Sequence, residues 1–267
     1  MTVYWCGYNF SVFANIIFGV TSHQWLPKNH YFHSTLFDFK APCTSDARDV
    51  LVYGAHGPCD CNPKTFLGKI LSVNGEDYQP TKYTSRTFQI GAGGFSFPYG
   101  AVEWLNQNMT QYTGPVKYHA VAYANSKCVR EREEMVKVLS KIVPVHAFGK
   151  CTGKGSAIGI KKPAHWISNT KIFEGYAFVF AAEHGVTDGY VTEKPFVAAA
   201  SGAVPIYWGD DALLKNFMNP QRVMVWNTST PYLVKKNMNS NLRQLPAVNK
   251  NNLIKKARKL ILNFFKI

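Results

Sequence analysis

The sequence lacks the features that mark several classes of protein. Its 267 residues contain no run of about 18 apolar residues, so nothing in it is predicted to span a membrane. The first eight residues lack the basic start and apolar centre of a secretory signal, which predicts a soluble, cytoplasmic protein. Hydrophobic residues make up 46% and charged residues 17%, a composition typical of a globular chain with two domains or one large one.

A metal-binding pattern of cysteines is also missing. The six cysteines include no Cys-x-x-Cys pair, and a chain of this length can bury a core without disulfides. A metal held by His56, Cys59 and Cys61 is the less favoured alternative, because two cysteines separated by one residue form a poor tetrahedral clamp. We therefore predict reduced thiols and no bound metal.

Acidic residues are absent from the last part of the chain. Residues 212–267 contain eleven lysines and arginines and no acid, whereas residues 1–115 contain seven residues of each sign. The apolar stripe of 253–267 predicts an amphipathic helix that packs on the second half, with peripheral membrane contact as the alternative. A non-catalytic module that binds nucleic acid through 212–267 is disfavoured, because aromatic and basic residues are not interleaved there.

Short apolar runs alternate with helical segments in both halves of the chain. Strands are expected at 2–6, 49–53, 69–73, 87–90, 116–123, 143–148, 176–182, 204–208 and 222–226. Helices are expected at 10–18, 127–142 and 193–201, and residues 92–115 are expected to form a linker. This alternation predicts an α/β protein with two Rossmann-like doubly wound domains, 1–112 and 113–267, that face each other across a cleft.

The stretch from Tyr176 to Gly209 carries the most chemistry. A strand is expected to end near Glu183, and a helix to begin after Thr192, which is a good N-cap residue. Lys194 lies in the first turn of that helix, beside backbone N–H groups that have no helical partner. A cation beside such donors favours a site for a diphosphate.

Tyr190-Val-Thr-Glu-Lys194, followed by Val-Pro-Ile-Tyr-Trp-Gly at 204–209, resembles the signature of the α1,3/4-fucosyltransferases, most closely their short, soluble bacterial and viral members. Glu183 and His184 stand where that family has the last two residues of Phe-Glu-Asn, so His184 is a departure. Weaker similarities lie at 49–54, 73–76 and 97–100, and in Asn125 with Arg132. The resemblance implies a glycosyltransferase-B fold, with an acceptor-side first domain and a GDP-fucose-binding second domain.

The resemblance also implies an activity and residue roles. Fucose would pass from GDP-fucose to the 3-hydroxyl, or the 4-hydroxyl, of N-acetylglucosamine in a glycan, with inversion in a single displacement. Glu76 is the implied base, with Asp77 as the fallback. Arg132 and Lys194 would stabilise the charge on the leaving GDP. The residues implied to bind the donor are Arg132, Glu183, His184, Tyr190, Thr192, Glu193 and Lys194.

Several neighbouring residues have simpler interpretations. Arg130 is expected to pair with a glutamate on an exposed helix face, an alternative that stays open for Arg132. Asp210 and Asp211 are expected to favour a helix N-terminus rather than bind a metal. The basic loop residues Lys150, Lys154, Lys161 and Lys162 are expected to be solvated. No tightly bound cofactor is expected, although stimulation by a divalent cation and the use of another nucleotide sugar are alternatives.

Overall fold

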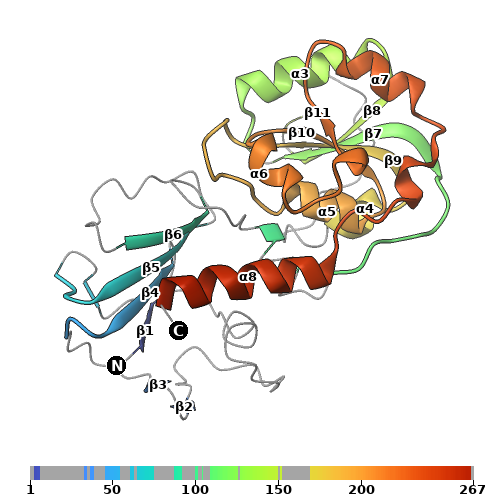
Figure 1. The fold of residues 1–267 in the computed structure, drawn as a ribbon. Coiled ribbons are helices and arrows are strands. Elements are labelled where there is room, and N and C mark those ends of the chain that lie inside the picture. Colours follow the sequence, from blue (N-terminus) through green and yellow to red (C-terminus); the bar gives the residue numbers. More distant parts are fainter. Residues whose placement is uncertain are drawn as a thin grey trace.

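The structure is a computed structural model, and it contains two separate parallel sheets. It describes residues 3–6, 33–34, 37–38, 46–54, 61–62, 65–74, 87–91, 100–101, 104, 109–125, 127–149, 151 and 169–265. Figure 1 shows the two sheets with helices around the second one. The helix predicted for residues 10–18 lies outside the described residues.

The first sheet contains four strands in the order β1-β4-β5-β6, and every neighbouring pair is parallel. These strands are β1 (Val3–Cys6), β4 (Val50–Gly54), β5 (Lys69–Asn74) and β6 (Thr87–Gly91). All four agree with the predicted strands to within one residue at each end. An antiparallel pair that was not predicted, β2 (His33–Ser34) and β3 (Phe37–Asp38), lies apart from this sheet.

The second sheet contains five parallel strands in the order β11-β10-β9-β7-β8. They are β7 (Tyr118–Asn125), β8 (Val145–Gly149), β9 (Tyr176–Ala182), β10 (Val204–Trp208) and β11 (Met224–Val225). All seven residues of β9 are buried, as expected for a central strand with helices on both faces. Strand β11 is shorter than predicted because Pro220–Arg222 forms a 3₁₀ turn, η2, before it.

Helices cover both faces of the second sheet (Figure 1). On one face, α3 (Arg130–Ser140) and α7 (Thr230–Lys236) bury Val136, Leu139 and Val234 against the strands. On the other face, α4 (Asn169–Phe173) and α5 (Lys194–Ala200) bury Phe173, Val197 and Ala198. The predicted doubly wound α/β architecture is therefore confirmed.

The segment predicted as a linker is partly helical and packed. Gly100, Ala101 and Trp104 are helical and buried, and the Trp104 ring lies 6.2 Å from that of Phe196 on α5. The Gly100 amide donates to the carbonyl of Val191 at 3.2 Å, and a Cβ atom at Gly100 would lie 1.9 Å from the Thr192 carbonyl oxygen. Glycine is required there, because any side chain would collide with that backbone.

A second contact joins the chain near Gln111 to the segment before the last helix. The Gln111 side-chain amide donates to the carbonyls of Arg243 and Leu245, and its oxygen accepts from the Ala247 amide. Arg243 follows the start of a second 3₁₀ turn, η3 (Asn241–Gln244). The domain boundary between residues 112 and 113 stays a prediction, since these contacts link residues on both sides of it.

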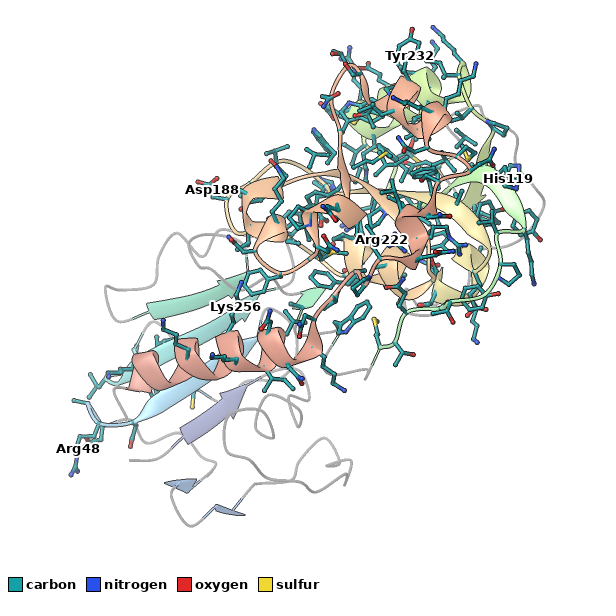
Figure 2. All side chains as sticks on the ribbon, turned by 45° about the vertical axis from the view of Figure 1, so that its right-hand side comes forward. Arg48, His119, Asp188, Arg222, Tyr232 and Lys256 are labelled. Atoms are coloured by element: carbon teal, nitrogen blue, oxygen red, sulfur yellow. A yellow bond between two sulfur atoms is a disulfide. The ribbon has the colours of Figure 1, made fainter. Side chains whose placement is uncertain are left out.

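The basic C-terminal segment forms the predicted amphipathic helix, α8 (Lys250–Phe265). Leu253 is buried, and Lys256 donates to the carbonyl of Asn216, which follows α6 (Asp211–Lys215). Figures 1 and 2 both show α8 running from the second sheet's helices alongside the first sheet. The predicted packing on the second half therefore holds for the start of α8, and membrane contact stays a prediction.

The prediction of reduced thiols was wrong. Cys128 and Cys151 form a disulfide, and Cys61 is also disulfide-bonded. The spacing of cysteines in the sequence did not reveal this, because β7 and β8 bring together residues that are 23 positions apart. None of the described helices is long and apolar enough to cross a membrane.

Candidate functional site

The strand order of the second sheet defines one place where a ligand is expected. The chain leaves β7 toward β8 on one side and returns to β9 on the other, so the order reverses between β7 and β9. In open α/β sheets, ligands bind beyond the carboxyl ends of the strands at such a reversal. Asn125 ends β7, and Glu183 directly follows β9.

Beyond the end of β9, Glu183 organises the predicted site. Its carboxylate is fully buried, and it accepts hydrogen bonds from the Thr192 amide at 2.8 Å and the Thr192 hydroxyl at 2.7 Å. The Lys194 ammonium donates to the same carboxylate at 2.9 Å and to the Thr192 hydroxyl at 2.8 Å. An ammonium has three N–H donors, so these two contacts leave Lys194 one donor for a ligand.

The charge of Lys194 is maintained by its surroundings. Burial opposes a charged ammonium, but Glu183, Glu193 and Tyr190 together outweigh this effect and raise the pKa of Lys194. About a quarter of the Lys194 side chain remains exposed. The lysine is therefore a permanent, partly accessible cation at the end of β9.

Gly209 and Tyr207 explain part of the Val-Pro-Ile-Tyr-Trp-Gly motif. The Tyr207 hydroxyl donates to Glu183 at 3.5 Å, and burial followed by the Glu183 charge raises the pKa of Tyr207. A Cβ atom at Gly209 would lie 2.7 Å from the Glu183 side chain and 2.4 Å from the Tyr207 hydroxyl. The glycine therefore leaves room for the buried acid that holds Lys194.

Asp210 and Asp211 act at the start of a helix, as predicted. Asp210 caps α6 by accepting from the Leu213 amide at 2.9 Å, and it also accepts from the Gly189 amide at 2.8 Å. The second contact fixes the loop that leads to Tyr190. Asp211 pairs with Lys215 one turn later. Both carboxylates therefore have partners within the chain.

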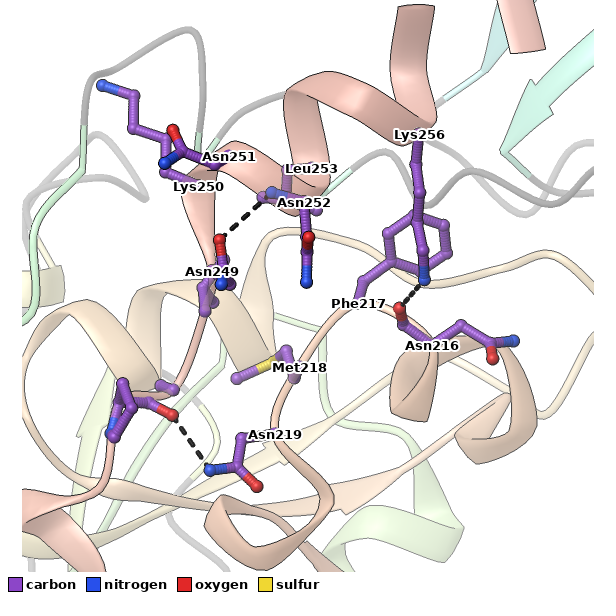
Figure 3. A pocket seen from close by; sticks show the side chains of 13 residues that line it. Asn216, Phe217, Met218, Asn219, Asn249, Lys250, Asn251, Asn252, Leu253 and Lys256 are labelled. Atoms are coloured by element: carbon purple, nitrogen blue, oxygen red, sulfur yellow. Dashed lines mark hydrogen bonds between the residues drawn. The ribbon is translucent and has the colours of Figure 1, made fainter. Parts of the chain in front are cut away.

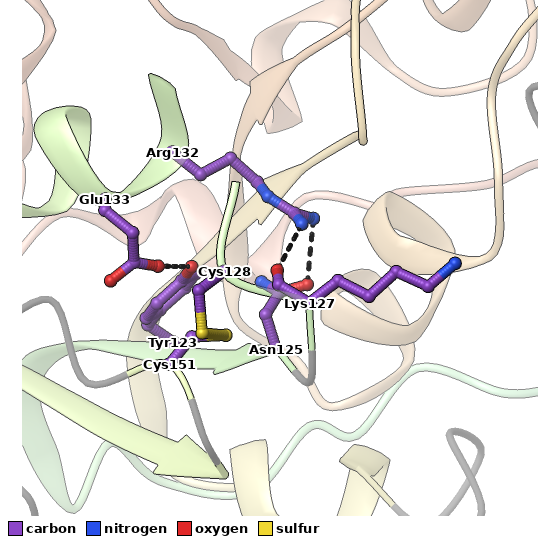
Figure 4. Close-up of a disulfide and its surroundings, with 7 residues drawn as sticks. All are labelled: Tyr123, Asn125, Lys127, Cys128, Arg132, Glu133 and Cys151. Atoms are coloured by element: carbon purple, nitrogen blue, oxygen red, sulfur yellow. Dashed lines mark hydrogen bonds between the residues drawn. A yellow bond between two sulfur atoms is a disulfide. The ribbon is translucent and has the colours of Figure 1, made fainter. Parts of the chain in front are cut away.

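At the end of β7, Arg132 is almost completely buried and faces the same edge of the sheet. Its guanidinium donates to the Asn125 side chain at 3.0 Å and the Lys127 carbonyl at 2.6 Å (Figure 4). It also donates to the Ala182 carbonyl at 3.4 Å. The last contact places it beside the residue before Glu183. Its buried Nε has no hydrogen-bond partner among the described residues. Arg132 therefore binds the carbonyls of Lys127 and Ala182, and its Nε stays without a partner among the described residues.

Neighbouring charges on α3 behave as the sequence suggested. Arg130 is exposed and pairs with Glu134 at 2.9 Å, which confirms its expected structural role. Glu133 accepts from the Tyr123 hydroxyl at 2.5 Å rather than pairing with Arg132. Burial and this carboxylate raise the pKa of Tyr123.

A small cavity lies between strands β7 and β9 and the helices α4 and α5 that cover them. Its lining includes Asn125, Glu193, Lys194 and Asn169, and its volume is about 30 Å³. The Asn169 side-chain oxygen is buried there with no hydrogen-bond partner among the described residues. A space of this size holds roughly one water or one polar group of a larger ligand. Asn169 was missed in the sequence, because nothing in the 161–172 segment marked it as the start of a helix.

The residues predicted to bind the donor differ in how deeply they are buried. Thr192 and Tyr190 are buried, while Glu193 is half-buried with a carboxylate 4.0 Å from the Lys194 ammonium. His184 is exposed at the start of the loop after β9. The predicted bases Glu76 and Asp77 lie outside the described residues, as do the four loop lysines at 150, 154, 161 and 162.

The start of α5 differs slightly from the prediction. The helix begins at Lys194 with Glu193 as its N-cap residue, and Glu193 makes no side-chain capping bond. The Thr192 hydroxyl accepts from the Lys194 amide at 3.4 Å, while it is also occupied by the Lys194 ammonium. With seven residues, α5 is short, so the dipole at its N-terminus is weak. The ammonium of Lys194 therefore supplies most of the positive charge at this position.

Cys128, Glu133 and Cys151 lie close enough to hold a metal ion. Two of these residues are joined in a disulfide, so their sulfur atoms are not available as thiolate ligands. Cys61 is likewise disulfide-bonded, which removes one ligand from the alternative metal group with His56 and Cys59.

A larger cavity of about 520 Å³ lies between the end of α6 and the start of α8 (Figure 3). Several asparagines line it, but local structure accounts for three of them. Asn219 caps η2, Asn249 accepts from the Asn252 amide at the start of α8, and Asn216 follows α6. The chemistry at the carboxyl edge is therefore the better candidate for a functional site.

Known structures share this fold. A crystal structure of an α1,3-fucosyltransferase aligns with the whole chain and with 90% of its own length, with a TM-score of 0.60 and 15% sequence identity. The same enzyme class with bound GDP gives a TM-score of 0.60 at 16% identity. The likeness shows that the chain has the two-domain glycosyltransferase-B fold.

A family model also matches part of the sequence. Residues 115–244 match the model of glycosyltransferase family 10 (fucosyltransferase), C-terminal domain. Over these residues the chain is similar to that family, which confirms the predicted resemblance. The matched range contains both cation-bearing loops, and it excludes the first sheet.

Curated relatives agree with the family and differ in their acceptors. The chain is 31% identical over 135 residues to an α-(1,4)-fucosyltransferase of Arabidopsis thaliana, covering 45% of this chain and 33% of the relative. It is 30% identical over 98 residues to human GDP-fucose protein O-fucosyltransferase 3, covering 35% of this chain and 20% of the relative. The alignments thus span a third or less of these relatives' lengths.

Proposed function

We propose that this protein transfers fucose from GDP-fucose to an acceptor hydroxyl. The observation that carries the proposal is the cluster beyond β9, where Glu183 and Thr192 hold the Lys194 ammonium beside a cavity with an unpaired Asn169 oxygen. This cluster lies at the strand-order reversal, where a nucleotide ligand is expected in such a sheet. It also lies within the range that matches the fucosyltransferase family.

The two cations have a specific role in this reaction. When the bond between fucose and the β-phosphate breaks, negative charge develops on the leaving GDP. Donors that are already in position stabilise that charge without reorganisation. Lys194 has one unused N–H, and Arg132 has an unpaired Nε. A hydrogen bond between a charged group and phosphate contributes about 1.5–3 kcal/mol.

The acceptor hydroxyl requires a base, and we assign that role to Glu76. The acceptor oxygen attacks the anomeric carbon of fucose, its proton passes to the Glu76 carboxylate, and GDP leaves with the bonding electron pair. One displacement inverts the anomeric centre. Support comes from sequence position: parallel strand β5 ends at Asn74, so Glu76 follows the carboxyl end of a strand in the first sheet.

The class of acceptor depends on the first half of the chain, which the family match does not include. The first candidate is the 3-hydroxyl or 4-hydroxyl of N-acetylglucosamine in a glycan. The second is a hydroxyl of a protein side chain, because one relative is named as a protein O-fucosyltransferase. Both candidates use the same donor site and the same base.

The disulfides bear on where the reaction takes place. Disulfides persist in oxidising environments and are rare in the cytosol. We therefore infer that the protein works in an oxidising compartment, in place of the cytoplasmic location expected from its first residues. No tightly bound cofactor is part of this proposal, and a divalent cation that binds with the diphosphate remains compatible with it.

The experiment is a transfer assay with GDP-fucose and two acceptors, N-acetyllactosamine and a folded serine- and threonine-containing protein domain. We expect release of GDP together with a mass gain of one fucose on one acceptor. Glu76→Gln is expected to lower kcat about 10²–10⁴-fold, the contribution of a general base. Release of GDP without fucosylated product would contradict the transferase proposal.

A binding control separates the donor from the reaction. Thermal shifts with GDP, UDP and ADP at equal concentration are expected to show stabilisation by GDP. A shift with UDP alone would indicate a related transferase with another nucleotide sugar. Full transfer activity in Glu76→Gln would refute the base assignment and leave the donor site intact.

A further inference from the structure

The Cys128–Cys151 disulfide lies at the same edge of the second sheet as the candidate donor site. Cys128 is in the short connection between β7 and α3, and Cys151 comes two residues after β8. Cys151 is buried and Cys128 is exposed. The disulfide therefore joins an exposed residue to a buried one.

The strands already hold this part of the fold together without the disulfide. Parallel pairing of β7 with β8 runs from Val121 opposite Val145 to Asn125 opposite Gly149. The disulfide lies beyond that last pair. Its direct effect in the folded state is therefore on the connection that follows Asn125, rather than on the register of the sheet.

That connection supplies the acceptors that orient Arg132. The Lys127 carbonyl, next to Cys128, accepts from Arg132 Nη2 at 2.6 Å, and the Asn125 side chain accepts from Nη1 at 3.0 Å (Figure 4). The Cys151 amide donates to the Asn125 carbonyl at 3.4 Å. The disulfide and this hydrogen bond thus fix both ends of the segment that holds the guanidinium.

We propose that the Cys128–Cys151 disulfide is a positioning element for Arg132, so that the oxidised protein binds GDP more tightly than the reduced one. This inference rests on the proposed function, in which Arg132 contacts the diphosphate. Reduction by a dithiol such as dithiothreitol transfers two electrons and two protons, giving two thiols and the oxidised cyclic disulfide of the reagent. The freed connection no longer holds the Lys127 carbonyl in place.

The test measures the dissociation constant of GDP by calorimetry, below the melting temperature of every variant. Cys128→Ser, Cys151→Ser and the double variant are each expected to bind GDP about 10-fold more weakly, close to the lower limit for one charge-assisted hydrogen bond. The double variant is expected to match the singles, because either change alone breaks the crosslink. Dithiothreitol is expected to weaken GDP binding by the unmodified protein to the same extent and to leave the variants unchanged.

Two further variants separate positioning from stability. Leu139→Ala removes a buried side chain from α3 away from the connection, so it lowers stability without a change in GDP affinity. In an Arg132→Ala background, loss of the disulfide is expected to cause no additional loss of affinity, because the residue being positioned is gone.

The outcomes distinguish the two proposals. If the unmodified protein binds GDP and the serine variants bind it equally well while melting earlier, the disulfide is purely stabilising and the positioning role is refuted. If serine variants lose affinity equally in the Arg132→Ala background, the disulfide acts through another group. If the unmodified protein binds no GDP, the donor assignment itself fails.

Discussion

The two ends of the second sheet bury arginines in opposite ways. Arg132 and Arg222 are among the largest fully buried side chains in the described part of the chain. At the amino end, Arg222 uses Nε, Nη1 and Nη2 to donate to the carbonyls of Leu245, Ala203 and Gly202. At the carboxyl end, Arg132 leaves Nε unpaired, and it contacts the carbonyl of Ala182, the residue before the Glu183 that holds Lys194.

This difference distinguishes a structural cation from one suited to a ligand. Burial, with the nearby charge of Arg243, lowers the pKa of Arg222 to about 10, so the fold accepts this charge at a cost and uses all of its nitrogens. At the carboxyl end a carboxylate instead raises the pKa of Lys194. A buried donor without a partner occurs at both ends, as Arg132 Nε and as Arg243 Nη2, whereas the unpaired acceptor among the described residues, Asn169, lines the cavity beside Lys194. Figure 2 shows Arg222 within the second sheet's helices.

The largest effect is expected for Lys194→Ala. It removes the cation that we propose faces the leaving phosphate, so kcat for fucose transfer should fall about 10²–10³-fold. Because the change leaves the buried Glu183 without its counter-ion, the double variant Glu183→Gln/Lys194→Ala should regain stability and stay inactive. Lys215→Ala, at an exposed lysine paired with Asp211, is the matched control and should retain activity. Steady-state rates of Lys194→Ala close to those of the parent would remove Lys194 from the mechanism.

The next largest effect is expected on stability, at the amino end of the second sheet where Arg222 lies. Arg222→Met should lower the free energy of unfolding by about 2 kcal/mol, because it leaves buried carbonyls without donors. The affinity for GDP should not change in the folded protein. Chemical denaturation and calorimetry check the two quantities separately. A loss of GDP affinity at unchanged stability would show that Arg222 acts on the ligand and would contradict its structural role.

A smaller effect is expected for Asn169→Leu. This variant removes the unpaired oxygen, so stability should stay equal or rise, while GDP-fucose binding should weaken by about 1 kcal/mol, or roughly fivefold. Thermal melting and calorimetry with GDP and GDP-fucose measure both changes. Lower stability with unchanged binding would indicate that Asn169 bonds an internal water instead of the donor.

The smallest expected effect is a pH dependence of stability that arises at the amino end of the second sheet. His146 Nδ1 lies 2.9 Å from the Tyr176 hydroxyl, and burial lowers the pKa of His146 below its usual 6.5. The unfolded chain then binds the proton more readily, so stability is present above pH 6.5 and declines as the pH falls below it. His146→Gln should reduce this decline in denaturation curves between pH 5 and pH 7. An identical decline in the variant would assign the effect to other groups.

Much of the fold was predictable because apolar runs determine buried strands. Strands β9 and β10 have the predicted limits, and the strands of the first sheet differ by one residue at most from the prediction. The short helix α4 and the turn at Pro220–Arg222 were missed, since segments of three to five residues show no clear helical period. Gly100 and Trp104 were assigned to a linker because Gly- and Pro-rich sequence hides their burial against α5.

The site was predictable in part. The motif from Tyr190 to Lys194 identified the lysine, but its partner Glu183 was expected to contact the donor, whereas the structure uses its carboxylate to hold Thr192 and Lys194. Asn169 could not be found in the same way, because its unpaired oxygen is defined only by residues that surround it in space. The proposed role of Glu76 rests on sequence alone.

The sequence by itself determined the order of strands and helices, the family match and the identity of the lysine that follows β9. Each of these depends on neighbours along the chain: apolar periodicity, motif spacing and local charge. Tertiary structure decided which cysteines pair, which arginine is structural and which polar atoms remain without partners. These properties depend on distances between residues far apart in sequence, which appear only when the parallel strands bring their carboxyl ends to one edge.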